Sequence, residues 1–270
     1  MYFVFDLDGT LANLYSEFYF VMSLQNSTNY VKFINKIAEI EASPNPLGIL
    51  RPGILYVMEK LHKLKSNVMI YSNNGNIESL EFVKDVIHAH LKGNLIKKCI
   101  HLDHSLRSIV PKNSMYDKTW EELKHILETF NTNVEPNEVY FFDDREHKNL
   151  FNVNYILVPE YTFVASFNRI AEIYKTITND VKTIEICKSK TRVCNKDVSP
   201  PCPDVGIYLM IRTIDGTAKA TAAVTAATAA VTAATATAKA KATKANARAK
   251  ARAKARARAK KRKTKKKEKF

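Results

Sequence analysis

The chain has 270 residues, 46% of them hydrophobic, which suits one large globular domain or a medium-sized domain with an appendage. Its net charge of +15 comes from the end of the sequence: residues 239–270 hold 17 of the 42 Lys and Arg and one of the 27 acidic residues, so residues 1–238 are nearly neutral. No run reaches the roughly 18 apolar residues of a membrane span, and the acidic start is unlike a signal peptide, so we expect no membrane partner.

The four cysteines, at positions 99, 187, 194 and 202, form neither a CxxC pair nor a dense disulfide framework. Reduced thiols in a nuclear or cytoplasmic compartment are therefore expected. No histidine lies near the last three cysteines, which disfavours a zinc site.

The chain begins with an apolar strand that ends in two carboxylates. Residues 2–5 read YFVF, and Asp6 and Asp8 follow one residue apart. On a strand they would point to the same side about 7 Å apart, so they repel and a positive group is expected beside them. Gly9 and Thr10 then favour a turn, in which the Thr hydroxyl can bond a carboxylate or the backbone. The alternative is a solvated strand end.

Residues 11–51 carry a helical pattern in two stretches, 17–25 and 29–41, which SPNPLG then closes. This region is either a small cap over the strand ends or the crossover to the next strand with a short insertion. We favour the crossover.

Three further apolar runs, residues 67–72, 138–144 and 155–158, predict buried strands, and helical patterns at 77–91 and 118–130 separate the first two. Strands that alternate with helices predict an α/β domain with a parallel sheet. Ligands of such sheets bind outside the carboxyl ends of the strands.

The folded domain is expected to span residues 1–178. Residues 179–216 read as a linker or an appended segment, with weak strand patterns and a Pro-rich break at 200–203. Residues 217–270 are low in complexity, first Ala and Thr and then Ala with Lys and Arg, and are expected to be disordered.

Polar and charged side chains follow three of the predicted strands and begin one predicted helix. They are Asp6, Asp8, Ser72, Asn73, Asp143, Asp144 and, at the helix, Lys118. Carboxylates that converge on one sheet edge form a hard-oxygen site that suits Mg²⁺, and the ion would supply the missing positive charge.

DLDGT, a strand-ending Ser, a Lys and an acidic pair, in this order, resemble the four motifs of the haloacid dehalogenase (HAD) superfamily of phosphatases. LRPGILYVMEKL and FFDDREH are further similar to the phosphatases of the RNA polymerase II carboxy-terminal domain, the NLI-interacting-factor-like branch. The resemblance covers residues 1 to about 175. It implies a Rossmann-like α/β/α domain with a small or absent cap, and Mg²⁺-dependent hydrolysis of a phosphate monoester through an aspartyl-phosphate.

By the same resemblance, Asp6 would be the nucleophile, and Asp8 would be the general acid and base. Mg²⁺ would be held by the Asp6 carboxylate, the backbone carbonyl of Asp8 and Asp143, with Asp144 close by as a further or water-mediated ligand.

Ser72, with Asn73 beside it, would bind the phosphoryl group; otherwise these residues only end a strand and make a turn. Lys118 would neutralise charge on the phosphoryl group and on Asp6, and we prefer it over Lys112 because it begins a helix. Thr10 is grouped with the substrate-binding residues and is expected to support Asp8.

The sequence also departs from the polymerase-domain branch. Gly9 stands where that branch usually has Glu, and no aromatic insertion for a Pro-containing peptide is evident. A phosphoserine or phosphothreonine protein, a small phosphate ester and a nucleic-acid end all remain open as substrates. Arg145 and His147 are expected to be exposed neighbours of the metal edge, and Arg51 is expected to shape a loop.

Residues 239–270 are expected to bind nucleic acid without sequence preference and in a salt-dependent manner, and KKRKTKKK would also serve as a nuclear localisation signal. A neutral repeat expansion is the alternative for this tail. The alternative for the whole chain is a catalytically silent HAD-fold protein that binds or packages nucleic acid. Similar phosphatases occur in large DNA viruses as well as eukaryotes, so a viral source stays open.

Overall fold

The computed structural model describes residues 1–14, 18–24, 27–107, 116–130, 133–150, 152–190 and 204–222. Lys112, Cys194, Cys202 and the basic tail of residues 239–270 lie outside these ranges. The chain divides into two compact units, Met1–Ile214 and Asp215–Phe270. Within the described ranges, no helix combines the length and the apolar character needed to cross a membrane.

Five parallel strands form the sheet of the first unit, in the order β3-β2-β1-β4-β5. They are β1 (Tyr2–Phe5), β2 (Asn67–Tyr71), β3 (Ile96–Ile100), β4 (Val139–Asp143) and β5 (Asn154–Leu157). The expected α/β fold with a parallel sheet is confirmed. Strand β1 lies at the centre, paired with β2 and β4, which explains why all four of its residues are apolar and buried.

Strand β3 was not predicted from the sequence. It reads IKKCI and forms one edge of the sheet, where Lys97 is exposed. An edge strand needs no continuous apolar run, and lysine on such a strand hinders pairing with other chains. The pattern that predicted the inner strands is therefore missing here.

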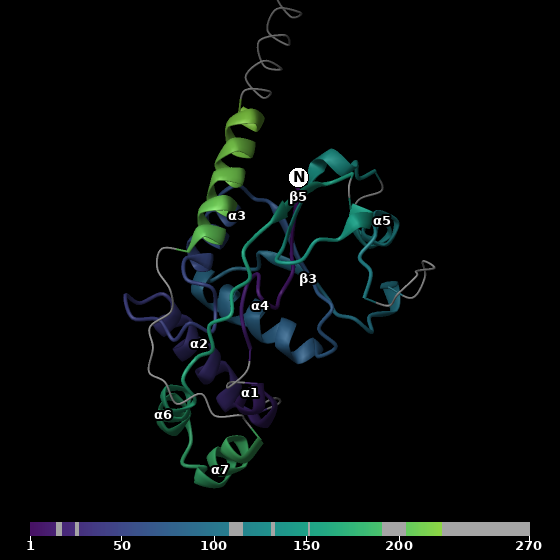
Figure 1. The fold of residues 1–270 in the computed structure, drawn as a ribbon. Coiled ribbons are helices and arrows are strands. Elements are labelled where there is room, and N and C mark those ends of the chain that lie inside the picture. The colour runs from purple at the N-terminus through teal and green to yellow at the C-terminus, as the bar shows by residue number, and fades with distance from the viewer. Residues whose placement is uncertain are drawn as a thin grey trace, which may run out of the picture. The chain divides into compact units, whose positions relative to one another are not determined.

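Seven labelled helices accompany the sheet. They are α1 (Phe18–Leu24), α2 (Asn29–Glu41), α3 (Ile54–Lys63), α4 (Ile77–Leu91), α5 (Trp120–Glu128), α6 (Phe167–Ile177) and α7 (Val181–Lys190). Because side chains alternate along a strand, Phe3 and Phe5 enter one core with residues of α2, α3, α4 and α6, whereas Tyr2 and Val4 enter another with residues of α5. Helix α5 therefore covers the opposite face, which gives three α/β/α layers (Figure 1).

Helices α1 and α2 belong to the crossover from β1 to β2 and not to a cap. Both pack against α4, and α2 also packs against α6. Phe33, Ile34 and Ile37 of α2 are buried in the core on that face of the sheet. The described residues of these two helices do not line the cleft at the strand ends.

The end of the first unit is helical where weak strand patterns had been noted. Helix α7 occupies residues 181–190, and residues 205–214 are also helical, with Ile207, Met210 and Ile214 buried in the core. The spacing of three and four between these apolar residues is that of a helix, which explains the difference. In the second unit, described residues 215–222 are helical as well.

Candidate active site

The carboxyl ends of three central strands place the acidic and polar residues side by side. Asp6 follows β1, Ser72 follows β2, and Asp143 ends β4. The backbone N–H of Asp6 donates to the Phe142 carbonyl at 2.9 Å, and that of Ser72 donates to the Ile100 carbonyl at 2.9 Å. These two backbone hydrogen bonds hold Asp6 and Ser72 one residue beyond the ends of β1 and β2.

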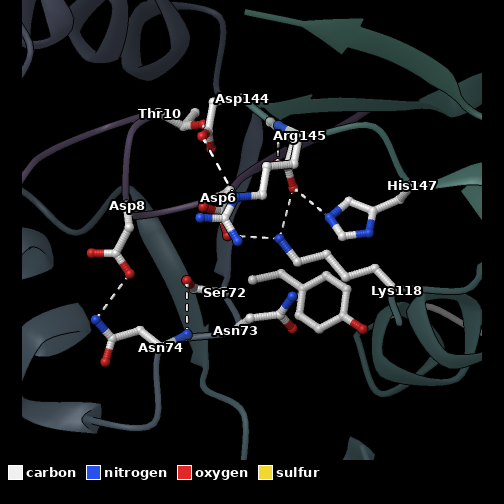
Figure 2. A network of polar contacts seen from close by, with 12 residues as sticks. Asp6, Asp8, Thr10, Ser72, Asn73, Asn74, Lys118, Asp144, Arg145 and His147 are labelled. Atoms are coloured by element: carbon white, nitrogen blue, oxygen red, sulfur yellow. Dashed lines mark hydrogen bonds and ion pairs between the residues drawn. The ribbon is translucent and has the colours of Figure 1, made fainter. Parts of the chain in front are cut away.

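Lys118 joins two of these carboxylates. Its Nζ lies 2.6 Å from Asp6 Oδ1 and 2.7 Å from Asp143 Oδ2, and all three residues are buried (Figure 2). We call Asp6, Lys118 and Asp143 the ion triad. Lys118 precedes α5 instead of beginning it, since Thr119 is the N-cap and accepts a hydrogen bond from the Glu122 N–H. In this structure Lys118 provides the positive charge that the acidic strand end requires.

The ion triad changes the proton affinities of its members. Burial raises the pKa of Asp6 although the charge of Lys118 opposes it. Burial also acts to raise the pKa of Asp143, but the hydrogen bonds from His147 and Lys118 outweigh it and the pKa is lowered. The pKa of Lys118 is raised because the two carboxylates outweigh the effect of burial. A charged lysine therefore faces at least one ionised carboxylate here.

Asp8 lies in the turn after β1 and not on the strand, which ends at Phe5. Asp8 borders the same cleft as Asp6, as expected, but strand alternation is not what brings it there. Asp8 is placed instead by the turn and by Asn74, whose Nδ2 donates to Asp8 Oδ2 at 3.0 Å. Partial burial of the carboxyl and the charge of Asp6 raise the pKa of Asp8.

Thr10 supports Asp144 and not Asp8. Its buried hydroxyl donates to Asp144 Oδ1 at 3.3 Å. Gly9 has φ +73°, and a Cβ on Gly9 would lie 2.7 Å from Asp144 Oδ2. Any side chain at this position would be strained and would displace Asp144, which gives a physical reason for glycine at position 9. Burial and the charges of Asp6 and Asp143 raise the pKa of Asp144 to about 6.

Three carboxylates fit a hard divalent cation. Oxygen atoms of Asp6, Asp143 and Asp144 lie within 4.8 Å of one another, and this is the acidic group with metal-ligand geometry that the described part of the chain contains. Burial is the main cause of the raised pKa values of Asp6 and Asp144, and the charges of neighbouring carboxylates add to it. The donor set therefore suits Mg²⁺.

The predicted residues meet in a cleft of about 250 Å³. Its lining contains most of them, namely Asp6, Asp8, Ser72, Asn73, Lys118 and Asp143, but not Thr10 and Asp144. Residues 72–74, which we call the Ser72 loop, form one wall (Figure 2). Within this loop the Asn74 N–H donates to Ser72 Oγ at 3.2 Å.

Several residues near the cleft were missed or assigned differently from the sequence. Asn74 was given no role from the sequence, yet it bonds Asp8. His147 is mostly buried, with Nε2 3.3 Å from Asp143 Oδ2, whereas Arg145 has 79% of its side chain exposed at the cleft. Arg107 lies buried beneath the Ser72 loop, and no local sequence signal marks it.

Neither a protein-family model nor a curated protein matches the sequence at a significant level. Among solved structures, the chain is similar to a HAD-superfamily hydrolase from Ehrlichia chaffeensis, with 18% sequence identity and a TM-score of 0.32 over 65% of this chain and 97% of that chain. We therefore base the function on the arrangement of the site residues.

Proposed function

We propose that this chain is a Mg²⁺-dependent phosphatase of the HAD type, which hydrolyses a phosphate monoester through an aspartyl-phosphate on Asp6. The observation that supports it best is the ion triad at the floor of a cleft that Asp8 also borders. A nucleophilic carboxylate, a fixed cation and a second carboxylate with a raised pKa are the groups that phosphoryl transfer needs.

Asp6 is the nucleophile in this proposal. Its carboxylate oxygen attacks phosphorus, the bond from phosphorus to the alcohol oxygen breaks, and Asp8 gives that oxygen its proton. Asp8 then takes a proton from water, whose oxygen attacks the phosphorus of the aspartyl-phosphate, and phosphate leaves with Asp6 restored. The raised pKa of Asp8 helps it to hold the proton for the first step.

The remaining residues bind and neutralise charge. Asp6 and Asp143 would hold Mg²⁺ with the Asp8 carbonyl, and Asp144 would lie next to them. When bound, the ion neutralises charge on the phosphoryl oxygens. Lys118 does the same from the side of α5, and Ser72 and Asn73 donate hydrogen bonds to the phosphoryl group.

The test is phosphate release from p-nitrophenyl phosphate. We expect turnover with Mg²⁺, loss of it in EDTA, and a fall of at least about 10³-fold for Asp6→Asn. Asp85→Asn on α4 is the matched carboxylate-to-amide control, because Asp85 accepts a hydrogen bond from Tyr30 outside the cleft. Turnover that survives Asp6→Asn in a purified, folded protein would refute the assignment.

A trapped intermediate gives a second, independent measurement. Acid quenching during turnover, followed by mass spectrometry, should show one phosphoryl group on the peptide that contains Asp6. Asp8→Asn should slow release of this group and increase its amount. A phosphoryl group on another residue contradicts the role of Asp6.

For the substrate class, the similarity of residues 50–61 and 141–147 to polymerase-domain phosphatases favours a phosphoserine or phosphothreonine protein. Wild type and Asp6→Asn should be compared on phosphopeptides, nucleotides and phosphorylated DNA ends. Preference for nucleotides or DNA ends would overturn this choice while leaving the phosphatase assignment intact.

We also propose that residues 239–270 bind nucleic acid, because they hold 17 basic residues and one acidic residue. Binding to DNA should weaken steeply with salt, as counterion release requires, and should disappear when residues 223–270 are deleted. Turnover of p-nitrophenyl phosphate should be unchanged by the deletion. Salt-sensitive DNA binding together with blank phosphatase assays would instead favour a catalytically silent nucleic-acid-binding protein.

A further inference from the structure

Arg107 is a buried arginine that the catalytic roles above do not use. It ends the short 3₁₀ helix Ser105–Arg107 and is only 2% exposed. Its guanidinium stacks over the Tyr71 ring, with 4.8 Å between the guanidinium carbon and the ring centroid. An arginine is rarely buried this completely unless directed partners offset the loss of water.

Two of its partners belong to the Ser72 loop. Nη1 donates to the Ser72 carbonyl at 2.8 Å, and Nη2 donates to Asn73 Oδ1 at 2.9 Å. These bonds set the Ser72 backbone and turn the Asn73 amide so that its Nδ2 donates to the Tyr116 carbonyl at 2.9 Å. One guanidinium thus fixes two consecutive residues of the cleft wall.

A further partner of Arg107, Glu122, lies on α5 and not in the Ser72 loop. Nε of Arg107 donates to Glu122 Oε1 at 3.2 Å, and Glu122 is fully buried on α5. Glu122 also accepts a hydrogen bond from the Tyr71 hydroxyl, and its backbone N–H binds the N-cap Thr119, next to Lys118. The Arg107–Glu122 pair therefore connects the Ser72 loop to the start of the helix that follows Lys118.

The side chains of Ser72 and Asn74 border the cleft, so the position of the Ser72 loop matters for both. Ser72 Oγ accepts from the Asn74 N–H, the Ser72 hydroxyl interacts with the Asp6 carboxylate, and the Asn74 side chain holds Asp8. A shift of the loop would therefore move both the phosphate-binding hydroxyl and the general acid.

We propose that Arg107 is a positioning residue that, through the Ser72 carbonyl, the Asn73 side chain and Glu122, sets the phosphate-binding Ser72 loop at a fixed distance from Lys118. This inference rests on the proposed function. The three partners need the planar guanidinium of arginine, whose Nε, Nη1 and Nη2 donate in different directions. Lysine carries the same charge on a single nitrogen and cannot replace it.

The test compares Arg107→Lys with wild type in three measurements: KM for p-nitrophenyl phosphate, binding of inorganic phosphate by calorimetry, and the Mg²⁺ concentration that half-activates the enzyme. We expect KM and the phosphate dissociation constant to rise about 10-fold, because the loop that binds phosphate loses its position. Half-activation by Mg²⁺ should stay within about twofold, since Arg107 contacts none of the three metal-binding carboxylates.

Arg169→Lys is the matched control. Arg169 of α6 also donates to two carbonyls, those of Pro46 and Asn45, both at 3.2 Å and away from the cleft. It should leave all three quantities unchanged. Glu122→Gln keeps the shape of the partner and serves as a milder variant if Arg107→Lys does not fold, with an expected rise of about threefold in KM and in the phosphate dissociation constant.

The outcomes separate this inference from the proposed function. Wild-type protein without turnover refutes the proposed function, and calorimetry still reports whether phosphate binding depends on Arg107. A folded Arg107→Lys protein that has a lower melting temperature but unchanged KM and phosphate affinity has lost only a structural contact, which overturns the positioning role. Equal weakening of phosphate and Mg²⁺ binding also overturns it.

Discussion

Lys118 and Arg51 are both buried cations paired with carboxylates, but they serve different regions. Lys118 lies 2.6 Å from Asp6 and 2.7 Å from Asp143 and borders the cleft. Arg51 Nε lies 2.9 Å from Asp204 Oδ2, while its other nitrogens donate to the carbonyls of Thr10 and Pro159. We call the Arg51–Asp204 pair and these two carbonyl bonds the arginine clasp.

The difference shows how a buried charge can be assigned a role. The guanidinium of Arg51 donates to protein groups at residues 10, 159 and 204, so the arginine clasp joins these three positions. Its central carbon lies 5.6 Å from the centre of the Tyr161 ring. The ammonium of Lys118 holds two carboxylates that line a cleft. We infer that the arginine clasp mainly stabilises the fold, as expected for a loop-shaping Arg51, and that the ion triad mainly serves chemistry.

The largest expected effect is that of Lys118→Met on catalysis. Turnover of p-nitrophenyl phosphate should fall by about 10²–10³-fold, because one charged donor to the phosphoryl group is removed. Lys124→Met on α5 is the control, since Lys124 is exposed and forms a long ion pair with Glu128 at 3.8 Å. If a folded Lys118→Met protein kept a turnover within threefold of wild type, the ion triad would not be needed for catalysis.

The second effect tests the arginine clasp. Asp204→Ala should lower the free energy of unfolding by about 3 kcal/mol, because it leaves a buried guanidinium without its carboxylate. Turnover per folded molecule should change by less than about threefold. Urea denaturation and a steady-state assay measure the two quantities. A protein of unchanged stability with a large loss of turnover would reverse the assignment of the two regions.

The third effect concerns Gly9, which lies between the two regions. Its carbonyl accepts from the Tyr161 N–H at 2.8 Å, and its α-carbon faces Asp144. Gly9→Ala should lower the free energy of unfolding by about 1–2 kcal/mol through backbone strain and should raise the Mg²⁺ concentration needed for half-activation by displacing Asp144.

Gly216→Ala is the control for this substitution. A Cβ on Gly216 would meet nothing within 4 Å, and the residue is helical, so alanine should be neutral or slightly stabilising. Equal Mg²⁺ half-activation in wild type and Gly9→Ala would show that Asp144 is not held where metal binding requires it.

The smallest effect concerns His88, a partly buried histidine outside both regions. Partial burial of His88, helped by the charge of Lys84, lowers its pKa, and His88 Nε2 accepts a hydrogen bond from the Ile96 N–H at 3.0 Å. The other charged or titratable groups near it are Asp85, Lys97 and His62. Because the folded-state pKa lies below the ordinary value, this contribution is present above about pH 6.5 and is lost as pH falls through the folded-state pKa.

His88→Gln keeps an acceptor and removes the titration. The free energy of unfolding of both proteins should be measured by urea denaturation from pH 5 to 8. Between pH 8 and pH 5 it should fall further for wild type than for the variant, by up to about 1 kcal/mol. Parallel pH profiles would show that His88 does not titrate differently in the folded state. Turnover should be the same in both proteins at each pH.

Much of the sheet and of the cleft was predictable from the sequence because the signals are local. Apolar runs predicted β1, β2, β4 and β5 within one or two residues, and helical spacing predicted α4 over residues 77–91. Since parallel strands meet at their carboxyl ends, Asp6, Ser72 and Asp143 could be expected at one edge before the structure was known. The polar edge strand β3 and the helices at residues 181–190 and 205–214 lacked such signals or carried ambiguous ones.

The identity of the strand-end residues follows from the sequence alone, since the alternation and burial of a strand depend on neighbouring positions. Tertiary structure decided the partners: Lys118 for Asp6 and Asp143, Asp144 for Thr10, Asn74 for Asp8, and Arg107 for the Ser72 loop. These contacts join segments that are far apart in the chain. Which buried charge meets which acceptor depends on how helices and loops pack over the sheet, and no local pattern encodes that choice.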